Sequence, residues 1–263
     1  MRLYWEVARR GFRRYATYRG ATFAGVFTNT VFGFIQAYVL LAVFRERGSI
    51  GGFDATDAVT FTFVVQGLLM VVAVFNWAEI AERIRTGDVV TDLYRPLDFQ
   101  AYWLAQDLGR ATFQAVFRGI PPFLVGALVF DLRLPEHAGV WAAFLLSAVL
   151  AVVVSFGVRY VVNLSAFWLL DVRGTLQITM AVWLFLSGIT LPLVLFPAWL
   201  EGVARALPFA AMVQVPVEVF LGKRTGLSLL GALAGQAAWA LALAGLGRVL
   251  LAAAVRRLVV QGG

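Results

Sequence analysis

The sequence predicts an all-α membrane protein with six transmembrane helices. Apolar residues make up 61% of its 263 residues and charged residues only 14%, whereas a soluble domain is about one-quarter charged. Several windows also exceed the ~18 residues that a bilayer-spanning helix needs, without meeting a charge. Both observations exclude an ordinary soluble domain.

The net charge of +7 does not indicate a nucleic-acid partner, because the basic residues cluster beside the apolar runs. Cysteine is absent, which excludes disulfides and thiolate chemistry. We find no internal repeat and no soluble domain, so residues 1–263 are expected to form one transmembrane domain.

Residues 1–20 predict an amphipathic helix that lies at the membrane surface. Aromatic side chains recur at helical spacing on one side, and the other side is basic. A basic face opposite an aromatic face suits the headgroup layer of an anionic leaflet. The alternative is an ordinary basic flank of the first span. The residues expected at the interface are Arg9, Arg10, Phe12, Arg13 and Arg14.

Apolar runs predict six spans, near residues 22–44, 58–78, 111–130, 138–170, 175–196 and 227–255. The fourth run is too long for one perpendicular crossing at 1.5 Å per residue, so it should tilt or project into water. Arg159 lies about two-thirds along this run, where we expect its side chain to extend toward the interface.

The distribution of Lys and Arg predicts the orientation. With both termini in the cytoplasm, 16 of the 22 Lys and Arg residues lie on the cytoplasmic side. Such an excess of basic residues is typical of cytoplasmic segments. Because both termini then lie on the same side, the number of spans must be even.

The largest polar interval, residues 79–110, is then predicted to be a cytoplasmic segment. Gly87 and Asp88 should end one helix and begin another, with Asp88 capping the second. Pro96 should stop that helix after residues 89–95. Asp92 and Arg95 are three residues apart and can pair on it or reach a partner protein. The alternative is a merely solvated loop.

Residues 197–221 predict short helices that lie in or dip into the outer leaflet. Prolines punctuate this region and its approach, so a continuous helix is not expected. Broken backbone of this kind must pack against protein. The alternative, one kinked extra span, would place the C-terminus outside, against the charge distribution.

Polar side chains inside the predicted spans either join helices or line a translocation path. For each residue alone, helix packing is the favoured interpretation. The candidates for path lining are Asn29, Gln36, Gln66, Asn163 and Gln177.

No residue pattern indicates an enzyme. The chain lacks a Walker lysine motif, and no His or carboxylate pair in a span has metal-ligand spacing. We therefore expect no catalytic residue, no bound metal and no cofactor in this chain. The predicted spans also hold almost no carboxylates, which disfavours an ion-coupled carrier.

Two stretches carry a family resemblance. In IRTGDVVTDLYRPLD (84–98) and SGITLPLVLFPAWLEGVARALPF (187–209), the pattern resembles the permease subunits of type-two ATP-binding-cassette (ABC) exporters, in particular bacterial multidrug or antibiotic exporters. Tyr94 replaces a leucine that is usual in the first motif. The topology agrees over the whole chain, but only these two stretches are specific.

The resemblance implies a coupling helix that a separate ATPase subunit holds in a groove. Its residues would be Arg85, Gly87, Asp88, Asp92, Leu93, Arg95, Pro96 and Leu97. The outer helices would cap the path through Pro192, Pro197, Trp199, Pro208 and Phe209. Two permease chains, identical or related, would pair in the bacterial plasma membrane. ATP and Mg²⁺ would bind only to the ATPase subunits.

The implied function is export of a hydrophobic or amphipathic compound, such as a drug, lipid or secondary metabolite. The alternative is an ion-coupled secondary transporter that works without an ATPase. A membrane-embedded lipid enzyme would need a catalytic cluster that we do not find, and a scaffold or signalling subunit stays open.

Overall fold

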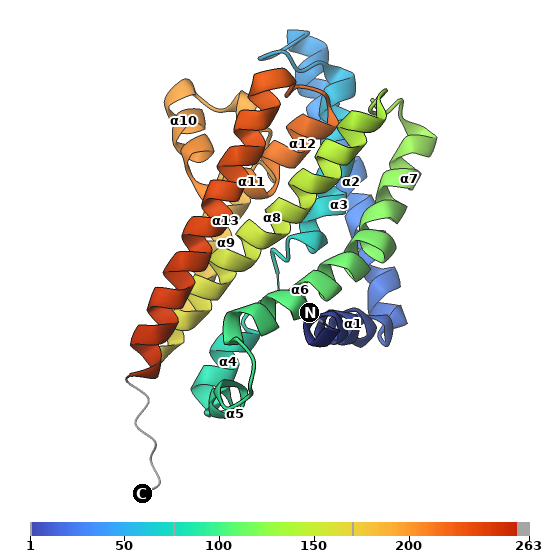
Figure 1. Ribbon diagram of the computed structural model, residues 1–263. Coiled ribbons are helices and arrows are strands. Elements are labelled where there is room, and N and C mark those ends of the chain that lie inside the picture. Colours follow the sequence, from blue (N-terminus) through green and yellow to red (C-terminus); the bar gives the residue numbers. More distant parts are fainter. Residues whose placement is uncertain (1, 76, 170, 257–263) are drawn as a thin grey trace, which may run out of the picture.

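The computed structural model describes residues 2–75, 77–169 and 171–256, and within these ranges the protein is all-α, as predicted (Figure 1). Met1 and residues 257–263 of the predicted domain lie outside the described residues. Long helices run alternately between the two ends of the molecule. They are α2 (Arg19–Arg47), α3 (Ala55–Val71), α6 (Phe99–Gln114) with α7 (Ile120–Val129), α8 (Ala138–Leu164), α9 (Arg173–Leu186) and α13 (Gly226–Val255).

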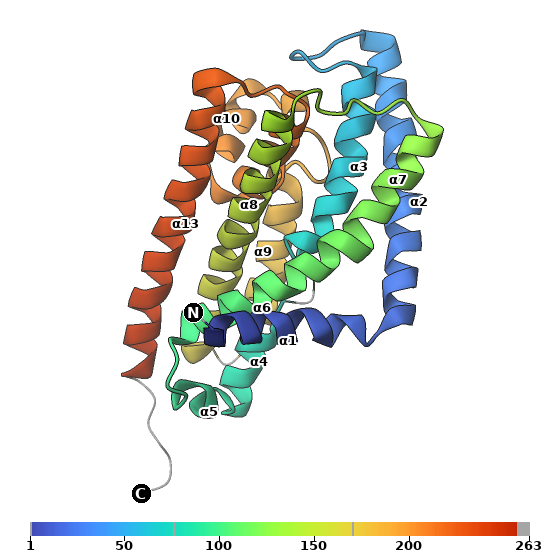
Figure 2. The same cartoon turned by 45° about the vertical axis from the view of Figure 1, so that its right-hand side comes forward.

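Four of these helical stretches are long and apolar enough to cross a membrane: Arg19–Glu46, Phe99–Val129, Ala138–Phe167 and Gly226–Val255. The helices α3 and α9 are shorter, with 17 and 14 residues. The six-span topology therefore stays a prediction. Helix α1 and the end of α13 lie at the same end of the molecule as α4 and α5, opposite α10 (Figures 1 and 2).

The third spanning helix begins earlier than predicted. It starts at Phe99, not near residue 111, and continues through the π-helical turn η1 (Ala115–Gly119) into α7. Asp98 starts it, because its Oδ1 accepts a hydrogen bond from the Ala101 N–H at 2.7 Å. The second half of the polar interval 79–110 is therefore helix α6, and several of its side chains are buried.

Two other helices end earlier than predicted. Helix α3 stops at Val71 instead of residue 78, and the chain turns at Ala73, which has φ +54°. Helix α9 stops at Leu186 instead of residue 196. The turn after it contains Gly188 at φ +88°, in the left-handed region that glycine adopts readily.

Helix α1 (Arg2–Ala16) lies across one end of the bundle and packs against α6 (Figure 2). The backbones approach closely, since a Cβ built on Gly109 would lie 1.8 Å from the Ala8 carbonyl oxygen. The Phe12 and Phe113 rings are 5.4 Å apart. The aromatic face thus contacts protein, whereas Arg9, Arg10, Arg13 and Arg14 are exposed.

The main core lies between α3, α8, α9 and the short helices that precede α13. Its largest buried side chains include Phe61, Trp183 and Met212. A second cluster joins the N-terminal end of α6 and the C-terminal part of α8 to α4 and α5. It includes Ile80 and Tyr160. This second cluster positions the candidate site.

Candidate functional site

The segment predicted to be a coupling helix forms two short helices, α4 (Glu79–Thr86) and α5 (Val89–Leu93). Gly87 ends α4 at φ +83°, and α5 ends before Pro96, as the sequence predicts. The predicted capping role of Asp88 is wrong. Its backbone is already α-helical, and its side chain accepts a hydrogen bond from the Thr86 hydroxyl at 2.9 Å instead.

A buried carboxylate holds this helix pair together. Asp92 is 4% exposed and pairs with Arg83 of α4 and, at 3.1 Å, with Arg95. The predicted Asp92–Arg95 pair is confirmed, and the Arg95 guanidinium also lies 5.0 Å from the centre of the Tyr102 ring of α6. Arg95 is therefore engaged within this chain.

Apolar side chains seat the helix pair on the bundle. Val89 and Ile80 are buried against Phe99 of α6 and Leu164 of α8. Leu93 and Leu97 are half-buried, whereas Arg85, Asp88 and Pro96 are exposed. Arg85 pairs with Glu82 at 2.6 Å. These contacts make α4 and α5 one rigid projection.

The most exposed large side chain of this projection is Tyr94, at 77%. It directly follows α5. Tyrosine is enriched in protein–protein interfaces relative to the rest of the surface. The sequence marked Tyr94 only as a departure from the family motif, and its exposure is visible only in the structure.

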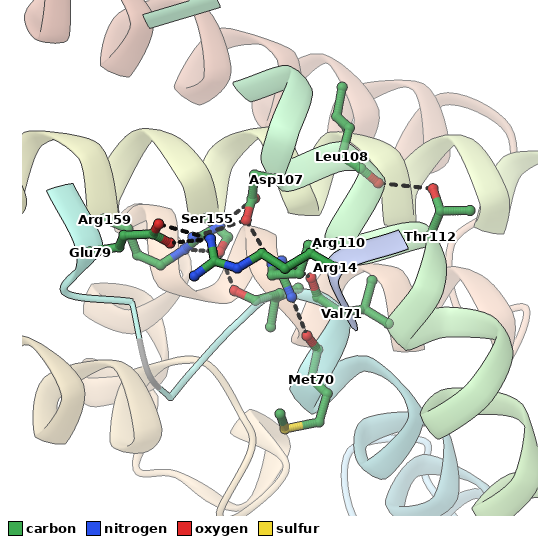
Figure 3. A network of polar contacts seen from close by, with 11 residues as sticks. Arg14, Met70, Val71, Glu79, Asp107, Leu108, Arg110, Thr112, Ser155 and Arg159 are labelled. Atoms are coloured by element: carbon green, nitrogen blue, oxygen red, sulfur yellow. Dashed lines mark hydrogen bonds and ion pairs between the residues drawn. The ribbon is translucent and has the colours of Figure 1, made fainter. Parts of the chain in front are cut away.

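A second polar cluster lies above the projection, where α1, α3, α6 and α8 meet (Figure 3). Asp107 of α6 is 8% exposed and accepts hydrogen bonds from two arginines. Arg110 Nε donates to it at 2.7 Å, and Arg159 Nη2 donates at 2.6 Å. We call Asp107, Arg110 and Arg159 the Asp107 cluster.

The Asp107 cluster also satisfies the end of α3. A helix leaves its last carbonyl groups without intrahelical partners. Arg110 donates to the carbonyl oxygens of Met70 at 2.6 Å and Val71 at 2.7 Å (Figure 3). Ser155 donates to Val72, and Arg159 donates to Ser155 at 3.2 Å. A break in a helix of a membrane protein is tolerated when protein groups satisfy the free backbone groups in this way.

Further contacts connect the projection to the bundle. Arg14 of α1 donates to both carboxylate oxygens of Glu79 at 2.8 and 3.0 Å. Asn163 of α8 accepts from the Ala81 N–H at 2.8 Å and donates to the Trp77 carbonyl at 3.0 Å. A cavity of about 70 Å³ lies between the Arg14–Glu79 pair and the Asp107 cluster.

The sequence analysis missed the Asp107 cluster. Arg159 is 7% exposed and paired, so the predicted extension of its side chain toward the interface is wrong. The expectation that the spans hold almost no carboxylates placed Asp107 outside them, whereas it lies in the helix Phe99–Val129. The available signal was the spacing of Asp107 and Arg110, three residues apart in a helical pattern.

Most candidate path-lining residues join helices. Asn29 donates to the Gln66 carbonyl at 3.3 Å, and Gln66 donates to Gln36 at 3.4 Å. Gln36 donates to the carbonyls of Ile189 and Thr190, both at 3.0 Å. Asn163 lies apart from them, at the projection. Gln177 of α9 is exposed on the outside of the described chain.

The broken outer segment forms α10 (Ala198–Ala206), α11 (Pro208–Met212) and α12 (Gln214–Phe220). Pro197 precedes α10, Pro208 begins α11, and Pro192 precedes the short 3₁₀ turn Leu193–Leu195. Phe209 packs against the main core, whereas Trp199 is 72% exposed.

Glu218 anchors this outer segment. It accepts hydrogen bonds from Arg205 at 2.7 Å, Gln214 at 2.9 Å and Arg224 at 2.8 Å. Burial by itself raises the pKa of Glu218. The hydrogen bonds and charges of Arg205, Gln214 and Arg224 outweigh burial and hold the pKa below its ordinary value of 4.5.

This shift predicts a pH dependence of stability. Because the folded state keeps Glu218 ionised to lower pH than the unfolded state, stability should fall as pH drops below about 5. Glu218→Gln should lose about 1.5–3 kcal/mol at pH 7, the value of a charged hydrogen bond. Thermal unfolding from pH 7 to 3.5 checks both, and Glu136→Gln, in the loop before α8, is the control. Equal pH profiles for Glu218→Gln and the unsubstituted protein would contradict the assignment.

The fold and these sites define an integral membrane protein with a rigid polar projection at one end of its helix bundle. The family model of the ABC-2 family transporter protein matches residues 29–262. The chain therefore belongs to the ABC-2 family and is an ABC-2-type permease subunit, a membrane component that works with an ATPase subunit. No curated protein and no solved structure matches the chain.

Proposed function

We propose that this permease exports a hydrophobic or amphipathic compound and that ATP hydrolysis in a separate subunit drives it through α4 and α5. The observation that supports this most directly is the rigid projection, which Asp92 holds together and Val89 seats on the bundle. A flexible loop in this place would absorb a push from the ATPase. A projection with buried ion pairs transmits it.

The contacts between the projection and the bundle can transmit a displacement of α4 and α5 to other helices. Displacement of α4 would act on α1 through the Arg14–Glu79 pair and on α8 through Asn163. The Asp107 cluster joins α8 and α6 to the end of α3. Helices α1, α3, α6 and α8 can therefore respond together, because packed helices move as discrete units rather than deforming.

The substrate class is inferred from the spanning helices. Their interior carries amides and the Asp107 cluster, and most of the remaining core is apolar. A second permease chain, identical or related, would complete the path, and the outer helices α10–α12 would cap it. The membrane would be the bacterial plasma membrane, with both termini in the cytoplasm.

An ion-coupled carrier is the competing proposal, and Asp107 is the observation that favours it. A buried carboxylate in a spanning helix is typical of proton relays. Here two arginines neutralise it, and two backbone carbonyls accept further hydrogen bonds from Arg110. Such a carboxylate is a structural ion pair rather than a site that exchanges protons.

The test is purification of the tagged chain from its native membrane in mild detergent, followed by reconstitution of the recovered complex. We expect a stoichiometric subunit with ATPase activity and transport that needs ATP but survives a protonophore. Recovery of the chain without an ATPase, with transport that collapses with the proton gradient, would overturn the proposal in favour of the carrier.

A further inference from the structure

One cation in the bundle has no visible counter-charge. Arg118 lies on the π-helical turn η1 within the long apolar helix Phe99–Val129. The Ile120 N–H bonds back to the Ala115 carbonyl, five residues earlier, and Pro121 follows directly. Proline cannot continue the regular hydrogen-bond pattern, which explains the wide turn. Single π turns inside α-helices are frequently found at functional sites.

The surroundings of Arg118 leave space for its guanidinium but do not neutralise its charge. A Cβ on Gly25 of α2 would lie 1.7 Å from Arg118 Nη2, so a larger residue at position 25 would force the guanidinium to move. Arg118 Nε is buried without a hydrogen-bond partner. In the part of the chain that the structure describes, no acidic side chain pairs with Arg118.

Arg118 is half-buried, and its surroundings differ from those of the buried Arg110 and Arg159. Arg110 and Arg159 share Asp107, and Arg110 also bonds backbone carbonyls. An unpaired charge in a membrane segment costs several kcal/mol. Arg118 therefore needs an anion from outside the described chain.

The depth of Arg118 suits a lipid phosphate. Gly25 is six residues from the start of α2 at Arg19, which is about 9 Å at 1.5 Å per residue. The surface helix α1 lies nearby, because Phe12 contacts Phe117, the residue before Arg118. An arginine at this depth reaches the headgroup layer, and its planar guanidinium binds phosphate through paired hydrogen bonds.

An apolar groove opens beside the same turn. Its volume is about 440 Å³, and it lies between η1 and α7 on one side and α3 and α8 on the other. Ala115, Gly119 and Ile120, which are close to Arg118 along the chain, line it, and Leu124 and Leu145 line it further along. Its lining is almost wholly hydrocarbon, as an acyl chain requires.

We propose that Arg118 and this groove form a binding site for one anionic phospholipid of the inner leaflet. The guanidinium of Arg118 binds the lipid phosphate, with Gly25 leaving space for it, and the groove takes an acyl chain. Anionic lipids are the counter-ions that a cytoplasmic leaflet supplies. The bound lipid neutralises Arg118 and fills the space between α7 and α8.

The experiment measures lipid binding to the purified permease by native mass spectrometry and by thermal stabilisation. The probes are phosphatidylglycerol, phosphatidylcholine with the same acyl chains, and inorganic phosphate. We expect preferential binding of phosphatidylglycerol, weakened about tenfold in Arg118→Gln and largely retained in Arg118→Lys. Arg248→Gln, which removes an exposed arginine from α13, should bind as the unsubstituted protein does.

Two further variants keep the test decisive if Arg118→Gln folds poorly. Gly25→Ala should displace the guanidinium without removing its charge and should also weaken phosphatidylglycerol binding, whereas Gly20→Ala, with open space around it, should not. Leu145→Trp should narrow the groove and weaken binding. Equal phosphatidylglycerol binding by Arg118→Gln, Gly25→Ala and the unsubstituted protein would overturn the site. Equal stabilisation by inorganic phosphate would overturn its assignment to a lipid.

Discussion

Replacing Asp107 with asparagine is expected to destabilise the permease by about 3–5 kcal/mol, because it leaves Arg110 and Arg159 as buried cations without an anion. The asparagine keeps the shape of the side chain, so the effect reports the charge rather than a cavity. Thermal unfolding in mild detergent measures it, with a shift of roughly 10 °C expected for a chain of this size.

The control is Asp131→Asn, which removes an exposed carboxylate from the loop between α7 and α8. It should leave the unfolding temperature unchanged. The double variant Asp107→Asn/Arg159→Gln should recover part of the loss, since one of the two uncompensated cations is removed. If Asp107→Asn unfolds at the same temperature as the control, the Asp107 cluster does not hold the end of α3.

Replacing Tyr94 with alanine is expected to weaken binding of the ATPase subunit about 30-fold. Aromatic side chains at the centre of an interface each contribute about 2 kcal/mol or more, and Tyr94 is the most exposed large side chain of the projection. The substitution removes no contact inside α4 or α5, so folding should be preserved. Binding of the ATPase subunit to permease in nanodiscs measures the effect.

Tyr18→Ala is the matched control, because Tyr18 is 68% exposed and lies between α1 and α2, away from the projection. Asp88→Lys tests the same surface by charge and should reduce transport-coupled ATP hydrolysis. Arg95→Glu is less informative, since Arg95 pairs with Asp92 and a second acid there would disturb the projection itself. Full ATPase binding by both Tyr94→Ala and Asp88→Lys would show that the ATPase does not hold this surface.

Local patterns predicted much of the architecture. The apolar runs located the long helices other than α6, because hydrocarbon excludes charge over a length set by the bilayer. Gly87 and Pro96 predicted the bounds of α5, and the prolines predicted the broken outer helices, because both residue types act on the backbone within a turn. The family motifs coincide with these same two regions.

The partners of the charged residues could not be predicted in this way. Asp92 pairs with Arg83, nine residues earlier, and Asp107 pairs with Arg159, 52 residues later. Each pair depends on where two helices cross, and crossing is set by packing of whole helix faces. The early start of α6 is a related case. Its polar residues predicted a segment exposed to water, whereas in the structure Arg159 and α1 bury them.

The sequence by itself therefore determined the membrane class, the approximate helices and the turn between α4 and α5, since each depends on neighbouring residues. Only the tertiary structure decided that α1 turns its aromatic face to α6 and that Arg110 completes the end of α3. It alone showed that no acidic side chain of the described residues pairs with Arg118. The physical reason is the same in each case: burial and pairing of a charge depend on what a distant segment brings to it.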